Sequence, residues 1–235
     1  MRVHAVCVFT QHQRDGQGCP LRDHDSTTDL SSFGTVEEFE SGLRPAARRR
    51  GCGPAGKIVL RVEGAAGLAN PGRIHFAGCL PIVDFYPAMD HLKQLWEALR
   101  GKNHPDFKQP YGRWTKRLLR DGVQRLIAQA RRWSEGSVCQ EAVEKRLHYF
   151  VSNVERMQYG TFRKQGSFIG SGVIEAGCKT VLGSRCKHSG RCWSERGAEN
   201  ILALRCIKLS RSWDNFWKSR ANDHAACNEA LPLAA

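Results

Sequence analysis

The sequence has no apolar stretch long enough to cross a membrane and no segment typical of a secretion signal. Its first apolar run, residues 3–9, is short and includes His4. Polar residues follow this run where a signal peptide would have its cleavage site. We therefore expect a protein without a membrane partner that resides in the cytoplasm.

Cysteine spacing typical of a structural zinc site is also missing. The chain has 10 cysteines, but no two of them are separated by two residues, and Cys178, Cys186 and Cys192 are irregularly spaced. A zinc site built from cysteines needs closely spaced pairs. We expect reduced thiols that act mainly as small apolar side chains.

Acidic residues are few relative to basic ones. The 235-residue chain has 36 Lys and Arg against 23 Asp and Glu, a formal net charge of +13. An excess of this size favours a polyanionic partner, because each neutralised phosphate releases counterions. A basic globular protein with no nucleic-acid role is the weaker alternative. The 41% hydrophobic content is ordinary for a globular chain that can bury a core.

Hydrophobic patterning predicts an α/β front part. Strands are expected near residues 2–10, 26–33, 57–62 and 80–86. Thr35-Val36-Glu37-Glu38 has the form of a capping box, which predicts a helix after the second strand. We expect that helix to end or kink near Pro45.

The back part is expected to be helical. Apolar residues at helical spacing predict helices around residues 89–99, 114–130 and 143–157, a loop over 166–172 leading into the helix of Glu175, and a last helix over 193–217. Residues 222–235 are expected to be disordered. Trp193, Trp213 and Trp217 are expected to pack in the core or between helices and not to stack on bases.

Several blocks of residues resemble the ISKra-type insertion-sequence transposases. The main one is residues 168–179, FIGSGVIEAGCK. Further blocks follow the same order in the chain: residues 7–11, 25–28, 153–157, 193–199, 203–205 and 213–217. The resemblance thus covers nearly all of the chain except its last dozen or so residues.

The resemblance implies a fold and a chemistry. The implied fold is a ribonuclease-H-like mixed sheet, here lacking its first strand, with a largely helical C-terminal half. Its acidic triad would bind Mg²⁺ or Mn²⁺ and catalyse DNA cleavage and strand transfer on transposon ends and target DNA. The implied domains are a partial core over residues 1–100, a helical insertion over 101–165, a helical segment over 166–220 and a tail over 221–235.

The acidic residues depart from the family pattern. Glu175 matches the third acid, and Glu63 stands where the second acid is normally Asp; both are candidate catalytic and metal-binding residues on the same side of the sheet. The longer Glu63 side chain would displace its carboxylate by roughly 1 Å. The first acid would precede Met1. Asp84 is expected to act as a supporting residue or helix N-cap, and Pro87 replaces a family histidine.

The expected DNA contacts lie near the helix of Glu175. These basic residues are Lys179, Arg185, Lys187, Arg191 and Arg196. Three hypotheses remain open: a transposase portion with impaired catalysis, associated with the nucleoid and possibly oligomeric; a non-catalytic DNA-binding protein or inhibitor of an intact transposase; and a non-functional remnant of a mobile element.

Overall fold

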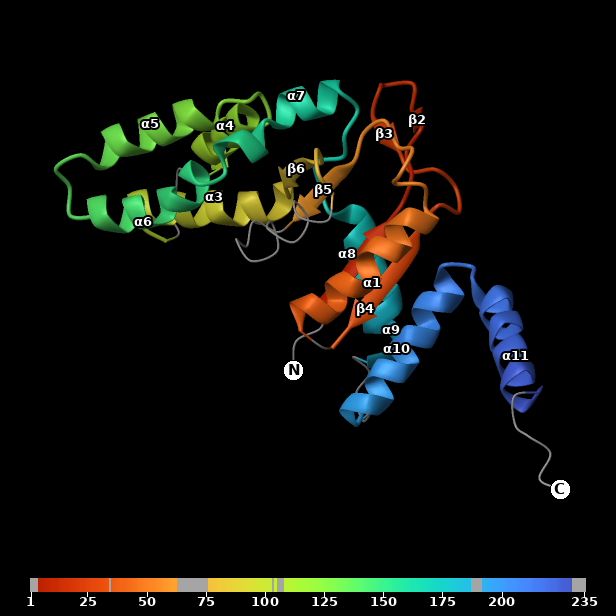
Figure 1. Cartoon of the computed structure of the whole chain (residues 1–235). Helices are drawn as coiled ribbons and strands as arrows, with labels where there is room; N and C mark the ends of the chain where they lie inside the picture. Colours follow the sequence, from red (N-terminus) through yellow and green to blue (C-terminus); the bar gives the residue numbers. More distant parts are fainter. Residues whose placement is uncertain are drawn as a thin grey trace. The chain divides into compact units, whose positions relative to one another are not determined.

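The protein is described from a computed structural model over residues 4–33, 35–62, 76–102, 104, 108–186 and 192–229 (Figure 1). The chain divides into two compact units. Unit 1 comprises Met1–His12, Arg22–Pro54 and Gly172–Ala235, and unit 2 comprises Gln13–Leu21 and Ala55–Ser171. Both units combine a small sheet with helices, so the predicted α/β class is confirmed.

Unit 1 is built on an antiparallel pair of strands. Strand β1 (His4–Val8) pairs with β4 (Thr28–Ser32), and Cys7 lies opposite Asp29. Because strand side chains alternate between faces, Cys7, Asp29 and Ser31 face one side and His4 and Thr28 the other. The two faces of the pair therefore meet different helices.

Helix α1 (Val36–Arg49) covers the face that carries His4 and Thr28. Its N-cap Thr35 forms the predicted capping box with Glu38. The helix does not end at Pro45 but continues through it to Arg49. Buried Leu43, Ala46 and Ala47 flank the proline and hold the last turn against the strands, and their burial outweighs the one backbone hydrogen bond that proline cannot make.

The opposite face of the strands is covered from the C-terminal part of unit 1. Helices α8 (Gly172–Cys178) and α10 (Glu195–Leu209) contact the strands there. A π-helical turn η2 (Lys179–Gly183) and the short α9 (Ser184–Cys186) follow α8, and α11 (Trp213–Glu229) follows α10 and packs on it. Helix α10 contacts β4 through Cys206, whose Sγ lies 3.4 Å from Ser31 Oγ, and through Ser210, whose Oγ accepts a hydrogen bond from the Asp29 N–H at 3.0 Å.

The single helix predicted over residues 193–217 is in fact two helices. Helix α10 ends at Leu209, and Arg211 adopts φ 55° before α11 begins. A left-handed residue cannot continue a right-handed helix. Helix α11 extends to Glu229, so residues 221–229 are helical where a disordered tail was expected.

Unit 2 combines two short strand pairs with a helical bundle. Strands β2 (Gln13–Arg14) and β3 (Pro20–Leu21) form a hairpin, while β5 (Val59–Val62) and β6 (Leu80–Val83) are parallel. The remaining elements are α3 (Phe85–Arg100), α4 (Lys108–Leu118), α5 (Val123–Ser134), α6 (Gln140–Val151), η1 (Val154–Met157) and α7 (Tyr159–Lys164). Helices α3 to α6 lie along one another in Figure 1.

The core of unit 2 is larger than that of unit 1. Fully buried Leu92, Leu118, Leu126, Leu147 and Phe150 join β6 in one cluster. An aromatic group continues it, in which Trp96 meets the ring of Trp114 edge-on at 5.5 Å and Trp114 stacks on Trp133 at 5.5 Å. Large buried aromatic rings supply much of the burial energy of a domain this small.

The four predicted strands are all present, but they pair in two separate sets. In the described residues β1 pairs with β4 and β5 with β6, without a ladder that joins the two pairs. The units also cut across the predicted domains, since residues 1–100 contribute to both. The ribonuclease-H-like arrangement stays a prediction. None of the described helices combines the length and apolar character needed to cross a membrane.

Asp121 connects the α4–α5 turn to α7. Its carboxylate accepts hydrogen bonds from the N–H groups of Gly160 at 2.7 Å and Thr161 at 2.9 Å, and its backbone has φ 59°. We expect Asp121→Ala to lower the free energy of unfolding by about 2 kcal/mol, because it removes a helix cap and places alanine in a left-handed conformation. Asp121→Asn should cost less, since asparagine tolerates that conformation. Urea unfolding would measure the stability of both variants, with the exposed Glu141→Ala as the control. Equal stability of Asp121→Ala and the control would refute the capping role of Asp121.

Candidate functional site

The residues of the main signature block fall in both units. Residues 168–171 belong to unit 2, where Ile169 accepts a hydrogen bond from the Phe85 N–H at 2.9 Å. Residues 172–179 belong to unit 1 and form α8 and the start of η2. The geometry of Glu175 is therefore set by its surroundings in unit 1.

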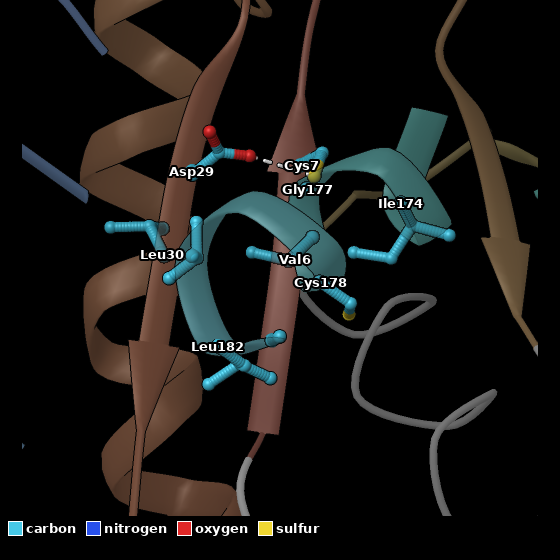
Figure 2. Close-up of a pocket in the computed structure, with 10 residues that line it drawn as sticks. Val6, Cys7, Asp29, Leu30, Ile174, Gly177, Cys178 and Leu182 are labelled. Carbon is cyan, nitrogen blue, oxygen red and sulfur yellow. Dashed lines mark hydrogen bonds between the residues drawn. The ribbon is translucent and has the colours of Figure 1, made fainter. Parts of the chain in front are cut away.

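Helix α8 lies very close to strand β1 at Gly177. A Cβ atom at this position would lie 2.6 Å from Cys7 Sγ and 3.1 Å from Asp29 Oδ1, so any other residue would force the elements apart. Figure 2 shows Cys7 and Asp29 beside Gly177, with Ile174, Cys178 and Leu182 around a small, mostly apolar pocket. Glycine is thus required for this packing of helix on strand.

Cys7 and Asp29 form a polar contact within these apolar surroundings. The thiol of Cys7 donates a hydrogen bond to Asp29 Oδ1 at 2.8 Å. Burial raises the pKa of the Cys7 thiol far above its usual value, and the neighbouring carboxylate adds to the increase. Cys7 therefore remains a protonated donor. Asp29 is the acidic residue nearest to α8 that the sequence analysis did not single out.

Glu175 lies on the side of α8 that faces solvent. Its side chain is exposed, and so is that of Lys179 one turn later. Residues four apart share a helix face, whereas Gly177 points toward the strand. The helix therefore presents an acidic and a basic side chain together on its outer face.

The predicted DNA-contacting residues are described only in part. Lys179 and Arg196 are exposed in unit 1. Arg185 lies in α9, but nothing is described of its side chain, and Lys187 and Arg191 lie outside the described residues. Two of the five predicted contacts are thus placed on the accessible surface of unit 1.

A π-helical turn follows α8 and is held by Arg205. The Arg205 guanidinium on α10 donates to the carbonyl oxygens of Thr180 and Val181, the latter at 3.1 Å, and to Ser184 Oγ at 2.6 Å. A π turn disturbs the regular helical pairing of carbonyl groups, and the fork of arginine donors satisfies these acceptors. Arg205, part of the resembling block at residues 203–205, therefore has a structural role in unit 1.

Asp84 occupies a buried position in unit 2. It is the N-cap of α3, where its Oδ1 accepts a hydrogen bond from the Tyr86 N–H at 2.9 Å, and its Oδ2 lies 3.6 Å from Arg61 Nε. N-capping is one of the two roles expected for it. Pro87 lies in the first turn of α3, which tolerates proline.

Two tyrosines, Tyr149 and Tyr159, lie near Asp84 inside unit 2. Burial raises the pKa of Tyr149 to about 12, Arg156 opposes the increase, and Asp84 adds to it. The pKa of Tyr159 is raised more strongly, first by burial and then by Tyr149 and Asp84. The hydroxyl groups of both tyrosines lack a hydrogen-bond partner among the described residues. Hydrophobic periodicity gave no signal for this cluster, because Asp84 is distant in the sequence from the two tyrosines and only the fold brings them together.

Only part of the metal site that the resemblance implies lies among the described residues. Glu63 lies outside the described residues. Asp84 is already engaged as an N-cap next to Arg61, and Glu175 is exposed in the other unit. In the described part of the chain there is no group of three or more His, Cys, Asp or Glu side chains that could hold a metal ion. We therefore derive no catalytic step through a metal.

Three tryptophans expected to pack in the core or between helices do not lie in the core. Trp193, Trp213 and Trp217 are 38%, 37% and 48% exposed. Helical spacing alone could not distinguish a core stripe from a surface stripe, because both repeat with the same period.

Comparisons of the chain with protein-family models, with curated proteins and with solved structures give no match. The family resemblance therefore rests on the sequence blocks alone.

The Cys7–Asp29 contact predicts a marked difference in thiol reactivity. Because the thiolate is the nucleophile, Cys7 should react with iodoacetamide at least about tenfold more slowly than the exposed Cys192 in the folded protein. Peptide mass spectrometry over a labelling time course would measure both rates. In Asp29→Asn the labelling of Cys7 should remain slow, since burial is the largest cause of its raised pKa. Equal rates for Cys7 and Cys192 in the folded wild type would contradict the described burial.

Proposed function

We propose that this chain is a DNA-binding protein related to the acidic-triad transposases, with impaired capacity for metal-dependent DNA cleavage and strand transfer. The observation that carries the proposal is the signature block at residues 168–179. Its acidic residue, Glu175, lies on the exposed face of α8 beside Lys179. The Lys179 ammonium group on this accessible helix suits contact with a phosphodiester backbone.

The charge of the whole chain supports the DNA-binding part of this proposal. A formal charge of +13 attracts polyanions over distances beyond direct contact. Lys179 and Arg196 have no ion pair recorded among the described residues, so both are accessible to phosphate groups. Non-specific binding to duplex DNA follows from such contacts.

Impaired catalysis is supported by the acidic residues. The second acid of the family is replaced by Glu63. Its longer side chain would displace the carboxylate by roughly 1 Å, enough to cost on the order of a hundredfold in rate. Asp84 is buried and engaged by Arg61. The second candidate function, a non-catalytic DNA-binding protein or an inhibitor of an intact transposase, is favoured by the same observations.

DNA binding should depend steeply on salt and on the predicted basic residues. We expect Lys179→Ala combined with Arg196→Ala to weaken binding to duplex DNA and to lower the slope of log affinity against log salt by about one for each phosphate contact removed. Fluorescence anisotropy with a labelled duplex would measure it. The control is Arg131→Ala, because Arg131 is paired with Glu144 at 2.8 Å and is less available to DNA. An affinity for wild type that does not change with salt would refute the proposal.

Catalysis should be undetectable. We expect the purified chain with Mg²⁺ or Mn²⁺ to neither nick nor join DNA, and Glu63→Asp alone to restore nothing, because a two-metal site needs several correctly placed carboxylates. Nicking of supercoiled plasmid is a suitable assay, with Glu175→Ala beside the wild type. Metal-dependent nicking that disappears in Glu175→Ala would show an active site and overturn the prediction of impaired catalysis.

A further inference from the structure

Helix α11 carries an exposed aromatic stripe near its N-terminus. We define this stripe as Trp213, Phe216, Trp217 and Arg220, which share one helix face because they are three or four residues apart. Trp213 and Trp217 are 37% and 48% exposed. Large aromatic side chains seldom remain this accessible on one face unless another molecule covers them.

The rings of the stripe are arranged as a pre-formed surface. Trp217 meets Trp213 edge-on with ring centroids 5.5 Å apart, and Phe216 meets Trp217 at 5.1 Å. Phe216 is the more buried of the three and packs against the Trp217 ring. Edge-to-face packing holds each ring in place while leaving an indole face accessible.

The charges on and beside the stripe favour an anionic partner. Arg220 is exposed on the same face, whereas the exposed Lys218 lies toward the other side of α11. Lys208 is exposed near the end of α10. Asp214 and Asp223 also lie on α11, but Asp214 is outside the stripe and Asp223 is at its edge. A second copy of the chain would bring two Arg220 side chains together on a protein that already carries +13, which disfavours self-association.

We infer that the stripe binds single-stranded DNA, with unpaired bases stacked on Trp213 and Trp217 and a phosphate group held by Arg220. Base faces are hidden inside a duplex and become available only where strands separate. Exposed aromatic rings beside basic side chains are the usual surface for such unpaired bases. The choice of DNA over other anionic polymers rests on the proposed function.

The test compares single-stranded and duplex DNA on the full chain. Labelled oligothymidylate should bind the wild type and quench its tryptophan fluorescence. Trp213→Ala with Trp217→Ala should weaken oligothymidylate binding roughly tenfold or more, because each stacked base contributes on the order of 1–3 kcal/mol. The same variant should bind duplex DNA within about twofold of wild type, since duplex contacts are made by basic side chains.

Two further variants separate stacking from loss of structure. Trp213→Phe with Trp217→Phe should retain most of the affinity, because phenylalanine still offers a ring face. Trp193→Ala removes a tryptophan of similar exposure at the opposite end of α10 and should have no effect on either ligand. Circular dichroism of each variant would show whether the fold is kept, and the Phe variant keeps the test valid if the Ala variant unfolds.

Each other outcome overturns a defined part of the proposal. Duplex binding without oligothymidylate binding, or an unchanged affinity in the Trp→Ala variant, would refute the single-strand site and leave the proposed function intact. Loss of a dimer in that variant by light scattering, with unchanged DNA affinity, would assign the stripe to self-association. Tighter binding to oligouridylate than to oligothymidylate would assign it to RNA. Failure to bind either form of DNA would refute both proposals.

Discussion

Helix α8 can lie against strand β1 only because residue 177 has no side chain. A Cβ atom there would collide with Cys7 Sγ at 2.6 Å, so this one glycine sets how closely the helix approaches the strand pair. The close approach places Ile174 and Cys178 around the pocket and turns Glu175 and Lys179 outward. The outward orientation of these two charged side chains thus depends on a packing contact on the other side of the same helix.

The Cys7–Asp29 pair lies at this close approach of α8 to β1. Asp29 is buried, but its carboxylate accepts a hydrogen bond from Cys7 and its N–H donates one to Ser210. Buried polar groups are tolerated when they have such partners. Through these two contacts Asp29 connects β1, β4 and the end of α10, the point after which the chain turns at Arg211 and begins α11.

The two acidic residues that the sequence analysis emphasised differ in environment. Asp84 is buried with Arg61 and caps α3, so its charge stabilises unit 2 from within. Glu175 is exposed on a helix of unit 1. The sequence could not give these environments, because burial and engagement by a neighbouring arginine depend on residues distant in the chain.

The sequence by itself determined the positions of the four strands, the capping box at Thr35 and the presence of most helices, because these depend on short-range periodicity and on local hydrogen bonding. Tertiary structure decided what local patterns could not. Helix α1 passes through Pro45 because Leu43 and Ala46 are buried on the strands, and the last helix divides at Arg211 in a left-handed conformation. Trp213 and Trp217 have the spacing of a core stripe, but they are exposed because, among the described elements of unit 1, α11 packs mainly on α10. The period of a pattern fixes which residues share a face, and only the packing of distant segments decides whether that face is covered.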